Sequence, residues 1–95
     1  HMKQGDKLFV RIDFKNETPK RTEQDLQDHI KYVNKIASER YFIAGSFTDT
    51  HGGMIIFAAN DYKEAKSLMD KDPIIERGFY RYELHEWNLL IVSPK

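Results

Sequence analysis

The sequence predicts a small α+β domain with the element order βαββαβ, the split βαβ arrangement of ferredoxin-like folds. Three observations lead to this prediction. Four short stretches carry the alternating or continuous apolar residues of strands. Two stretches between them carry the three- and four-residue apolar spacing of helices. Turn-forming Gly and Pro residues separate several of these elements, and the 95 residues fit one domain (1–95) with no room for a second.

The first strand is expected at residues 7–14, where apolar side chains occupy every second position. This alternation predicts one buried face and an opposite face that carries Phe9, Arg11 and Asp13. The main apolar face would consist of Leu8, Val10, Ile12 and Phe14.

A first helix is expected to begin at Thr22, because Thr22 and Asp25 have the spacing of a capping box. The helix would run to about Arg40. Its inward stripe would consist of Leu26, Ile30, Val33 and Ile36 with Ala37.

Two further strands are expected at residues 41–48 and 54–59, separated by a turn at residues 49–53 whose glycines permit positive φ. The stretch 54–59 is apolar on both sides, which indicates a strand covered on both faces.

The last third of the chain predicts a second helix capped by Asn60 or Asp61 and ended by the Asp72-Pro73 pair, since the residue before proline disfavours helical geometry. A fourth strand is expected at residues 79–87, and a short fifth at 89–92.

Both helices would cover the same face of the antiparallel sheet. The other face would carry Phe9, Phe47 and Phe57 or their alternates, depending on strand register. An exposed apolar face of that size is a liability for a monomer. We therefore predict a homodimer formed through the sheet faces, a dimeric α+β barrel.

Charge and composition narrow the classes of partner. Fifteen basic and fifteen acidic residues cancel, which argues against nucleic acid or an anionic membrane as the partner. There is no cysteine, so disulfides and Cys-based metal sites are excluded. No apolar run approaches the roughly 20 residues needed to span a bilayer. A cytoplasmic protein is expected, in which His1-Met2 is a cloning remnant.

His29 interrupts the apolar stripe of the first helix, between Leu26 and Val33 at spacings of three and four. Two interpretations remain open. The commoner one is a packed neutral histidine bonded to a carbonyl group. The other is a general acid/base at the edge of a pocket. Asp72 likewise either caps the turn that follows it or orients the imidazole of His29.

The remaining polar residues offer weaker candidates. Ser46 follows Gly45 without a nucleophile motif, so we expect it to be structural or to bind a ligand through a hydrogen bond. Arg11 and Asp13 would line an intersubunit cavity, where Arg11 would contact a ligand, or they would pair with charges on a neighbouring strand. His51 and His85 are expected at the surface. The spacing of the histidines does not fit a metal site. Gly52-Gly53 is not part of a GxGxxG or P-loop motif that would bind phosphate. Neither a metal nor a cofactor is therefore expected.

Nearly the whole chain resembles the YciI-like (YCII-related) family. Beyond the helix histidine and Tyr32, the order and spacing of several short motifs carry the resemblance: Tyr41-Phe42-Ile43-Ala44-Gly45-Ser46-Phe47, Gly52-Gly53, Glu64-Ala65, Asp72-Pro73 and Glu86-Trp87. The resemblance implies a ferredoxin-like dimeric α+β barrel. It also implies that His29 and Asp72 match the characteristic histidine and aspartate of the family, which suggest enzymatic activity. The family includes a dehydrochlorinase of chlorinated hydroxyquinols.

The sequence departs from the family pattern at two points. Leu26 stands where many members have an arginine, and Gly45-Ser46 stands where many have Gly-Pro. The reaction of one relative is therefore not transferred. The function expected is small-molecule acid/base chemistry of the lyase or hydrolase type at His29 and Asp72. The alternative is a non-catalytic ligand-binding or accessory domain with a structural histidine.

The chain order poses a geometric question about this pair. We expect both helices to run roughly in the same direction, which would separate His29, in the first half of its helix, from Asp72, after the end of the other. Three arrangements stay open: a ligand bridges the pair, the pair is completed across the dimer, or the two residues form no dyad.

Overall fold

A computed structural model describes residues 2–94; His1, half of the predicted cloning remnant, lies outside the described residues. The elements follow the order β1 (Lys7–Lys15), α1 (Glu23–Ala37), β2 (Phe42–Ser46), β3 (Gly53–Phe57), α2 (Tyr62–Asp70), α3 (Pro73–Glu76) and β4 (Tyr80–Asn88). The predicted βαββαβ order is confirmed, with one short helix, α3, inserted before the last strand.

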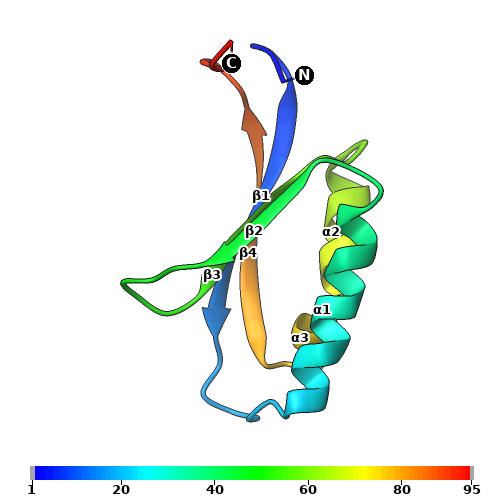
Figure 1. Cartoon of the computed structure of the whole chain (residues 1–95), viewed down its shortest axis with the longest axis vertical. Coiled ribbons are helices and arrows are strands. Elements are labelled where there is room, and N and C mark those ends of the chain that lie inside the picture. The colour runs from blue at the N-terminus through cyan, green and yellow to red at the C-terminus, as the bar shows by residue number, and fades with distance from the viewer. Residues whose placement is uncertain (1, 95) are drawn as a thin grey trace.

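The four strands form one antiparallel sheet in the order β2-β3-β1-β4, and the helices lie on one side of it (Figure 1). This is the ferredoxin-like α+β arrangement. The predicted fifth strand at residues 89–92 is wrong, because β4 ends at Asn88. Instead, the Leu89 amide donates to Asp6 and Leu89 accepts from the Gly5 amide. Leu90 and Ile91 beyond it are exposed.

The face of β1 that packs against the helices is the opposite of the face predicted from the sequence. Phe9 and Arg11 are buried, whereas Phe14 on the other face is exposed. Phe9 packs against Phe57 with ring centroids 6.0 Å apart, and this pair forms the centre of the core. The other core residues are Ile36, Ile55, Ala65 and Met69.

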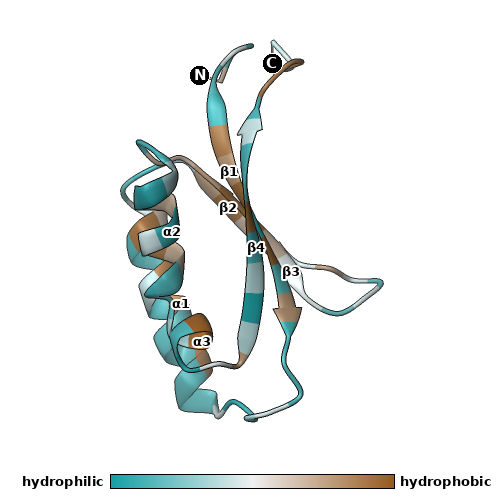
Figure 2. Ribbon diagram, turned by 180° about the vertical axis from the view of Figure 1, so that it is seen from behind, coloured by the Kyte–Doolittle hydropathy of each residue, from teal (hydrophilic) through white to brown (hydrophobic). Residues whose placement is uncertain are grey.

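The helices leave the other face of the sheet uncovered, and hydrophobic residues lie along its strands (Figure 2). This face carries the alternates of the buried phenylalanines, namely Val10, Ile12, Met54 and Ile56, next to Ile43. No other element of residues 2–94 covers this face. The expectation that the third strand is covered on both sides is therefore wrong within one chain: Met54 is exposed, while its neighbour Ile55 is buried.

The two long helices run in opposite directions (Figure 1), so the expectation that they run together is wrong. The sheet register gives the reason. Lys15 at the end of β1 pairs with Tyr80 at the start of β4, so α1 leaves the sheet at the end to which α2 and α3 return. The first half of α1 and the segment after α2 consequently lie at the same end of the sheet.

Local sequence signals fix both helix starts. Thr22 and Asp25 form the predicted capping box of α1, and Asp61, one of the two predicted candidates, caps α2.

Arg77, at the C-terminal end of α3, connects α3 to the first half of α1. Its Nη1 lies 2.8 Å from both Asp25 Oδ1 and Asp28 Oδ2 on α1. This contact holds the His29 region of α1 against α3.

We predict that Arg77→Gln destabilises the protein in a pH-dependent way. Hydrogen bonds from Thr22 lower the pKa of Asp25, with a further contribution from Arg77, and the Arg77 hydrogen bond lowers the pKa of Asp28. Carboxylates with lowered pKa stabilise the fold above their unfolded pKa, and that stabilisation is lost as the pH falls through the folded pKa. The difference in Tm between wild type and Arg77→Gln should thus be present at pH 7 and shrink as the solution is acidified.

Arg81→Gln serves as the matched control, because Arg81 donates to the neutral amide oxygen of Asn16. Its Tm difference from wild type should not change with pH in this way. A constant Tm difference for Arg77→Gln between pH 7 and pH 3 would contradict the proposed role of the two carboxylates.

Candidate functional site

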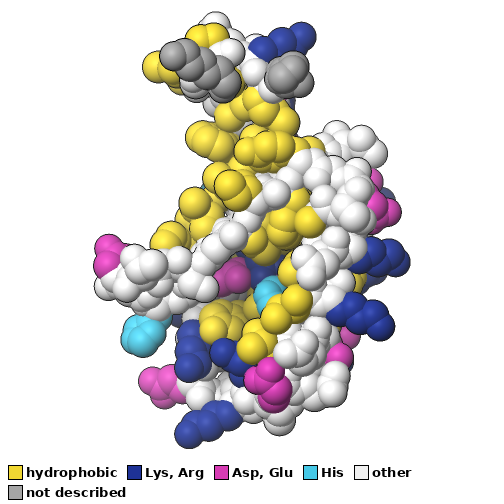
Figure 3. Space-filling view, in the orientation of Figure 1, with side chains coloured by type: hydrophobic (Ala, Val, Ile, Leu, Met, Phe, Trp, Pro, Cys, Tyr) yellow, Lys and Arg dark blue, Asp and Glu magenta, His cyan; other side chains and the backbone are white. Residues whose placement is uncertain are grey.

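A cavity of about 270 Å³ opens between α1, α3 and the strands. In the space-filling view a histidine, an acidic side chain and basic side chains meet in a hollow between the helices and the β2–β3 hairpin (Figure 3). Its polar lining comes from Asp13, Arg21, His29, Ser46 and Tyr80. Its apolar lining includes Leu26, Val33, Ile55 and Ile74. The volume lies just below the roughly 300–1,000 Å³ typical of ligand pockets, which suits a small molecule of about one ring.

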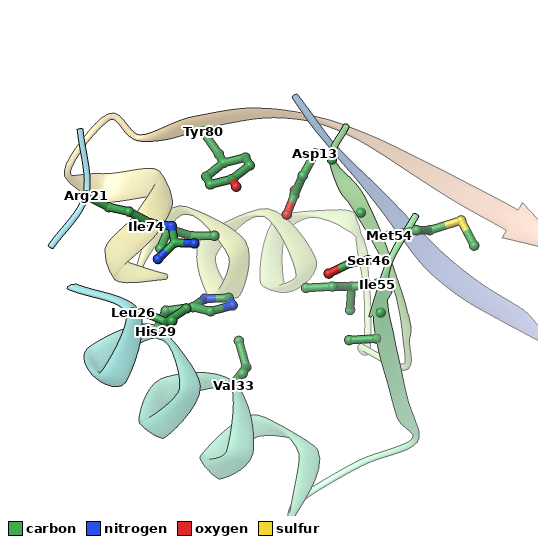
Figure 4. A pocket seen from close by; sticks show the side chains of 14 residues that line it. Asp13, Arg21, Leu26, His29, Val33, Ser46, Met54, Ile55, Ile74 and Tyr80 are labelled. Atoms are coloured by element: carbon green, nitrogen blue, oxygen red, sulfur yellow. The ribbon is translucent and has the colours of Figure 1, made fainter. Parts of the chain in front are cut away.

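His29 and Asp72 meet within one chain. The His29 Nδ1 lies 2.7 Å from Asp72 Oδ1 and 3.0 Å from Oδ2. An ionised carboxylate only accepts hydrogen bonds, so Nδ1 carries the proton of this contact and Nε2 is left for the pocket. Figure 4 shows the free edge of the imidazole directed into the cavity. The antiparallel helices thus remove the need for a ligand or a second subunit to complete the pair.

Asp72 is fully buried and bonded on several sides. Its Oδ2 lies 2.9 Å from Nη1 of Arg11, and its Oδ1 accepts from the amide of Ile74 at 3.2 Å. The second bond makes Asp72 the cap of α3, as one interpretation of the sequence predicted. The two interpretations of Asp72 are therefore compatible: one carboxylate caps a helix and holds the imidazole.

Arg11 lies behind the pocket, with 0% of its side chain exposed. Its Nε and Nη2 bind the two carboxylate oxygens of Asp13 at 2.6 and 2.9 Å, and its guanidinium lies 5.7 Å from the centre of the Tyr82 ring. Burial opposes the charge, but the hydrogen bonds and charges of Asp13 and Asp72 outweigh it and raise the pKa of Arg11. Arg11 is therefore a fixed cation inside the domain.

This placement corrects one sequence prediction. Arg11 was expected to contact a ligand in an intersubunit cavity, but its complete burial and its bonds to Asp13 and Asp72 exclude direct contact in this conformation. Arg11 does pair with charges, but not on a neighbouring strand as expected: Asp13 lies on the same strand and Asp72 caps α3. Ser46 lines the cavity from the end of β2, where it can reach a ligand.

Asp13, which was expected to line an intersubunit cavity, lines this cavity within one chain, and two further polar lining residues, Arg21 and Tyr80, were not identified as site residues from the sequence. The sequence pattern could have placed Asp13 there, since an Arg-x-Asp pair on a strand face beside Phe9 indicates a buried ion pair. For Tyr80 the only sequence indication was its position at the start of a strand. No sequence pattern indicates that Arg21, which precedes the cap of α1, lines the cavity, because its position depends on the path of the loop.

Within residues 2–94, no group of three or more His, Asp or Glu side chains is arranged to hold a metal ion. None of the helices described there is long and apolar enough to cross a membrane.

Comparisons with known proteins agree with this architecture. Residues 8–88 match the model of the YCII-related domain. The chain belongs to the YCII-related family. Among solved structures it is similar to the 5-chloro-2-hydroxyhydroquinone dehydrochlorinase (TftG) of Burkholderia phenoliruptrix in complex with 2,5-dihydroxybenzoquinone, with a TM-score of 0.58 and 18% identity. The similarity covers 85% of this chain and 93% of the other. No curated protein sequence matches.

We predict that Arg11→Met lowers the free energy of unfolding by about 3–5 kcal/mol, the range for breaking a buried ion pair. Methionine retains much of the side-chain length but leaves two carboxylates, Asp13 and Asp72, without their shared cation. Urea unfolding at pH 7 measures the change. Adding Asp13→Asn to Arg11→Met should recover part of the loss, because it removes one of the uncompensated charges.

Arg40→Met provides the comparison for this experiment. Arg40 forms its ion pair with Glu64 at a more exposed position, where such pairs contribute about 1 kcal/mol or less. Equal losses for Arg11→Met and Arg40→Met would refute the role given to the buried Arg11 cation.

Proposed function

We propose that this YCII-related protein binds a small ring compound in the cavity and that Nε2 of His29 transfers a proton to or from it. The observation that carries the proposal is the His29–Asp72 hydrogen bond. It fixes the ring orientation and the tautomer, and it leaves Nε2 without a proton at the wall of the cavity. Asp72 touches no ligand in this scheme; it is the positioning residue, held in turn by Arg11.

The reaction class follows from what surrounds Nε2. A histidine base beside apolar walls can remove a proton from carbon or oxygen, and a hydroxyl such as that of Ser46 or Tyr80 can donate a hydrogen bond to a substrate oxygen. A base and a hydrogen-bond donor of this kind are sufficient for proton transfer and for elimination reactions. Elimination of HCl from a chlorinated hydroxyquinol is the reaction in the name of the similar dehydrochlorinase, and we propose a related class of substrate here.

A non-catalytic ligand-binding or accessory domain is the second candidate function. The observation that favours it is that Asp72 both caps α3 and contacts His29. The capping role alone is a structural reason for an aspartate at this position. In that case His29 would be a neutral partner that completes the hydrogen bonds of a buried charge.

His29→Asn separates the two functions. The Asn amide nitrogen can take the place of Nδ1 and donate to Asp72, while nothing replaces Nε2. If His29 is the acid/base, turnover should fall about 10²- to 10⁴-fold with little change in Tm. Chloride release from 5-chloro-2-hydroxyhydroquinone is the first assay, followed by uptake of solvent deuterium into acidic carbonyl compounds.

His29→Gln is the matched variant, because its amide reaches toward the position of Nε2 and loses the bond to Asp72. Its Tm should therefore fall further than that of His29→Asn. Unchanged turnover in His29→Asn, or a loss of Tm without a loss of turnover, would support the structural histidine and contradict the catalytic proposal.

We also propose that two copies of the chain associate through the open face of the sheet. The face is apolar at its centre, with Ile43 56% and Met54 36% exposed, and its edge strand adds the half-exposed Trp87. Because the chain has no net charge, two copies do not repel each other. Beyond β4, the exposed Leu90 and Ile91 extend from the body of the domain, where a second copy would cover them.

Ile43→Glu should convert the dimer to a monomer, since it puts a charge into the centre of the proposed interface. Ile43 is largely exposed in the single chain, so the fold should be retained. Sedimentation velocity at micromolar concentration measures the change. Ile30→Glu is the control, because Ile30 is 40% exposed on α1, away from this face. A monomeric wild type would reject this proposal.

A further inference from the structure

Arg21 differs from the other arginines of the described chain. Its side chain lines the His29 cavity and makes neither a hydrogen bond nor an ion pair with any of residues 2–94. The remaining arginines, Arg11, Arg40, Arg77 and Arg81, each bind a protein oxygen. An arginine in a pocket wall with all of its donors available is able to bind an oxyanion through two parallel hydrogen bonds.

The charges around the cavity fix where an anion could sit. Asp13 and Asp72 share the single permanent cation Arg11, so the floor beneath His29 repels a negative group unless the imidazole is protonated. Arg21 is the one Lys or Arg that lines this cavity within the described residues. In Figure 4 it reaches in from the loop before α1, on the side opposite Ser46 and Asp13.

The surface next to the cavity is also positively charged, like Arg21. A second depression, bounded in part by Arg21 and Tyr80, is lined by Lys15, Lys20 and Arg21 and by a single acidic residue, Glu17. The whole chain is neutral, so this excess of positive charge is local. It would attract an anion toward the mouth of the cavity.

We propose that Arg21 is the anion-binding residue of the pocket, and that its ligands are small ring acids whose ionised oxygen binds to the guanidinium. The ring lies between Leu26, Val33 and Ile74, and the Tyr80 hydroxyl donates to the same anionic group. This inference rests on the proposed function, since it assumes that the cavity is the ligand site. It places the ligand with its acid group at the mouth and its uncharged edge at His29.

Benzoate and benzamide test this inference, because they have nearly the same shape and differ in charge. Binding is followed by the NMR shifts of the amides of Gly45, Gly52 and Gly53, which line the cavity. Arg21→Gln should weaken benzoate binding about 10- to 100-fold, the effect of a lost hydrogen bond to a charged group. Benzamide binding should be equal in the two proteins. Arg21→Lys should give an intermediate affinity for benzoate, since it keeps the charge and loses the paired donors.

Lys20→Gln is the control for charge alone. It removes the same charge from the adjacent residue, which does not line the His29 cavity, so it should change benzoate affinity less than about twofold, the scale of a screened surface charge. Failure of wild type to bind benzoate at millimolar concentration, shifts outside the cavity, or equal losses in Arg21→Gln and Lys20→Gln would overturn the inference. The His29 assays report proton transfer independently, so the two proposals fail separately.

Discussion

The carboxylate of Asp72 is the interaction on which the site depends. It accepts hydrogen bonds from the imidazole of His29 on α1 and from an amide at the start of α3, and it forms an ion pair with the guanidinium of Arg11 on β1. A buried charge is costly unless each of its acceptor sites has a partner. The arrangement of α1, α3 and the sheet around Asp72 is therefore a condition for burying it, and the orientation of His29 follows from that condition.

The same constraint explains why the inner face of β1 contains an ion pair. Arg11 would be unstable in the core by itself, but Asp13 binds it on one side and Asp72 on the other. The cation in turn permits two carboxylates to approach a cavity. Hydrophobic contacts such as Phe9 with Phe57 supply the surrounding core, while the charged cluster determines which end of the domain holds the pocket.

The sequence predicted the element order and the cap of α1, and it gave Asp61 as one of two candidates for the cap of α2, because each depends on local spacing. It also named His29 and Ser46, which line the cavity, and Asp72, which contacts His29, through a resemblance spread over the chain. It predicted the wrong buried face of β1. Both faces contain large apolar residues, and the choice depends on Phe57 and on Asp72, the distant counterion of Arg11, both of which lie far from β1 in sequence. The contact of His29 with Asp72 likewise depends on helix direction, a tertiary property that the spacing of residues does not contain.

The cavity and the open sheet face are separated by very little protein. Met54 lines the His29 cavity and also the apolar groove with Val10, Ile56 and Trp87. Beside it, Gly52 has φ +92°, and a Cβ there would meet the carbonyl of Asp13, while a Cβ on Gly53 would lie 2.5 Å from the Gly45 oxygen. A side chain is thus excluded at Gly52 and Gly53, where backbone lines the cavity. If two copies associate through the open face as proposed, the second copy would hold Met54 in place, and dimerisation would then restrict the cavity proposed here as the ligand site.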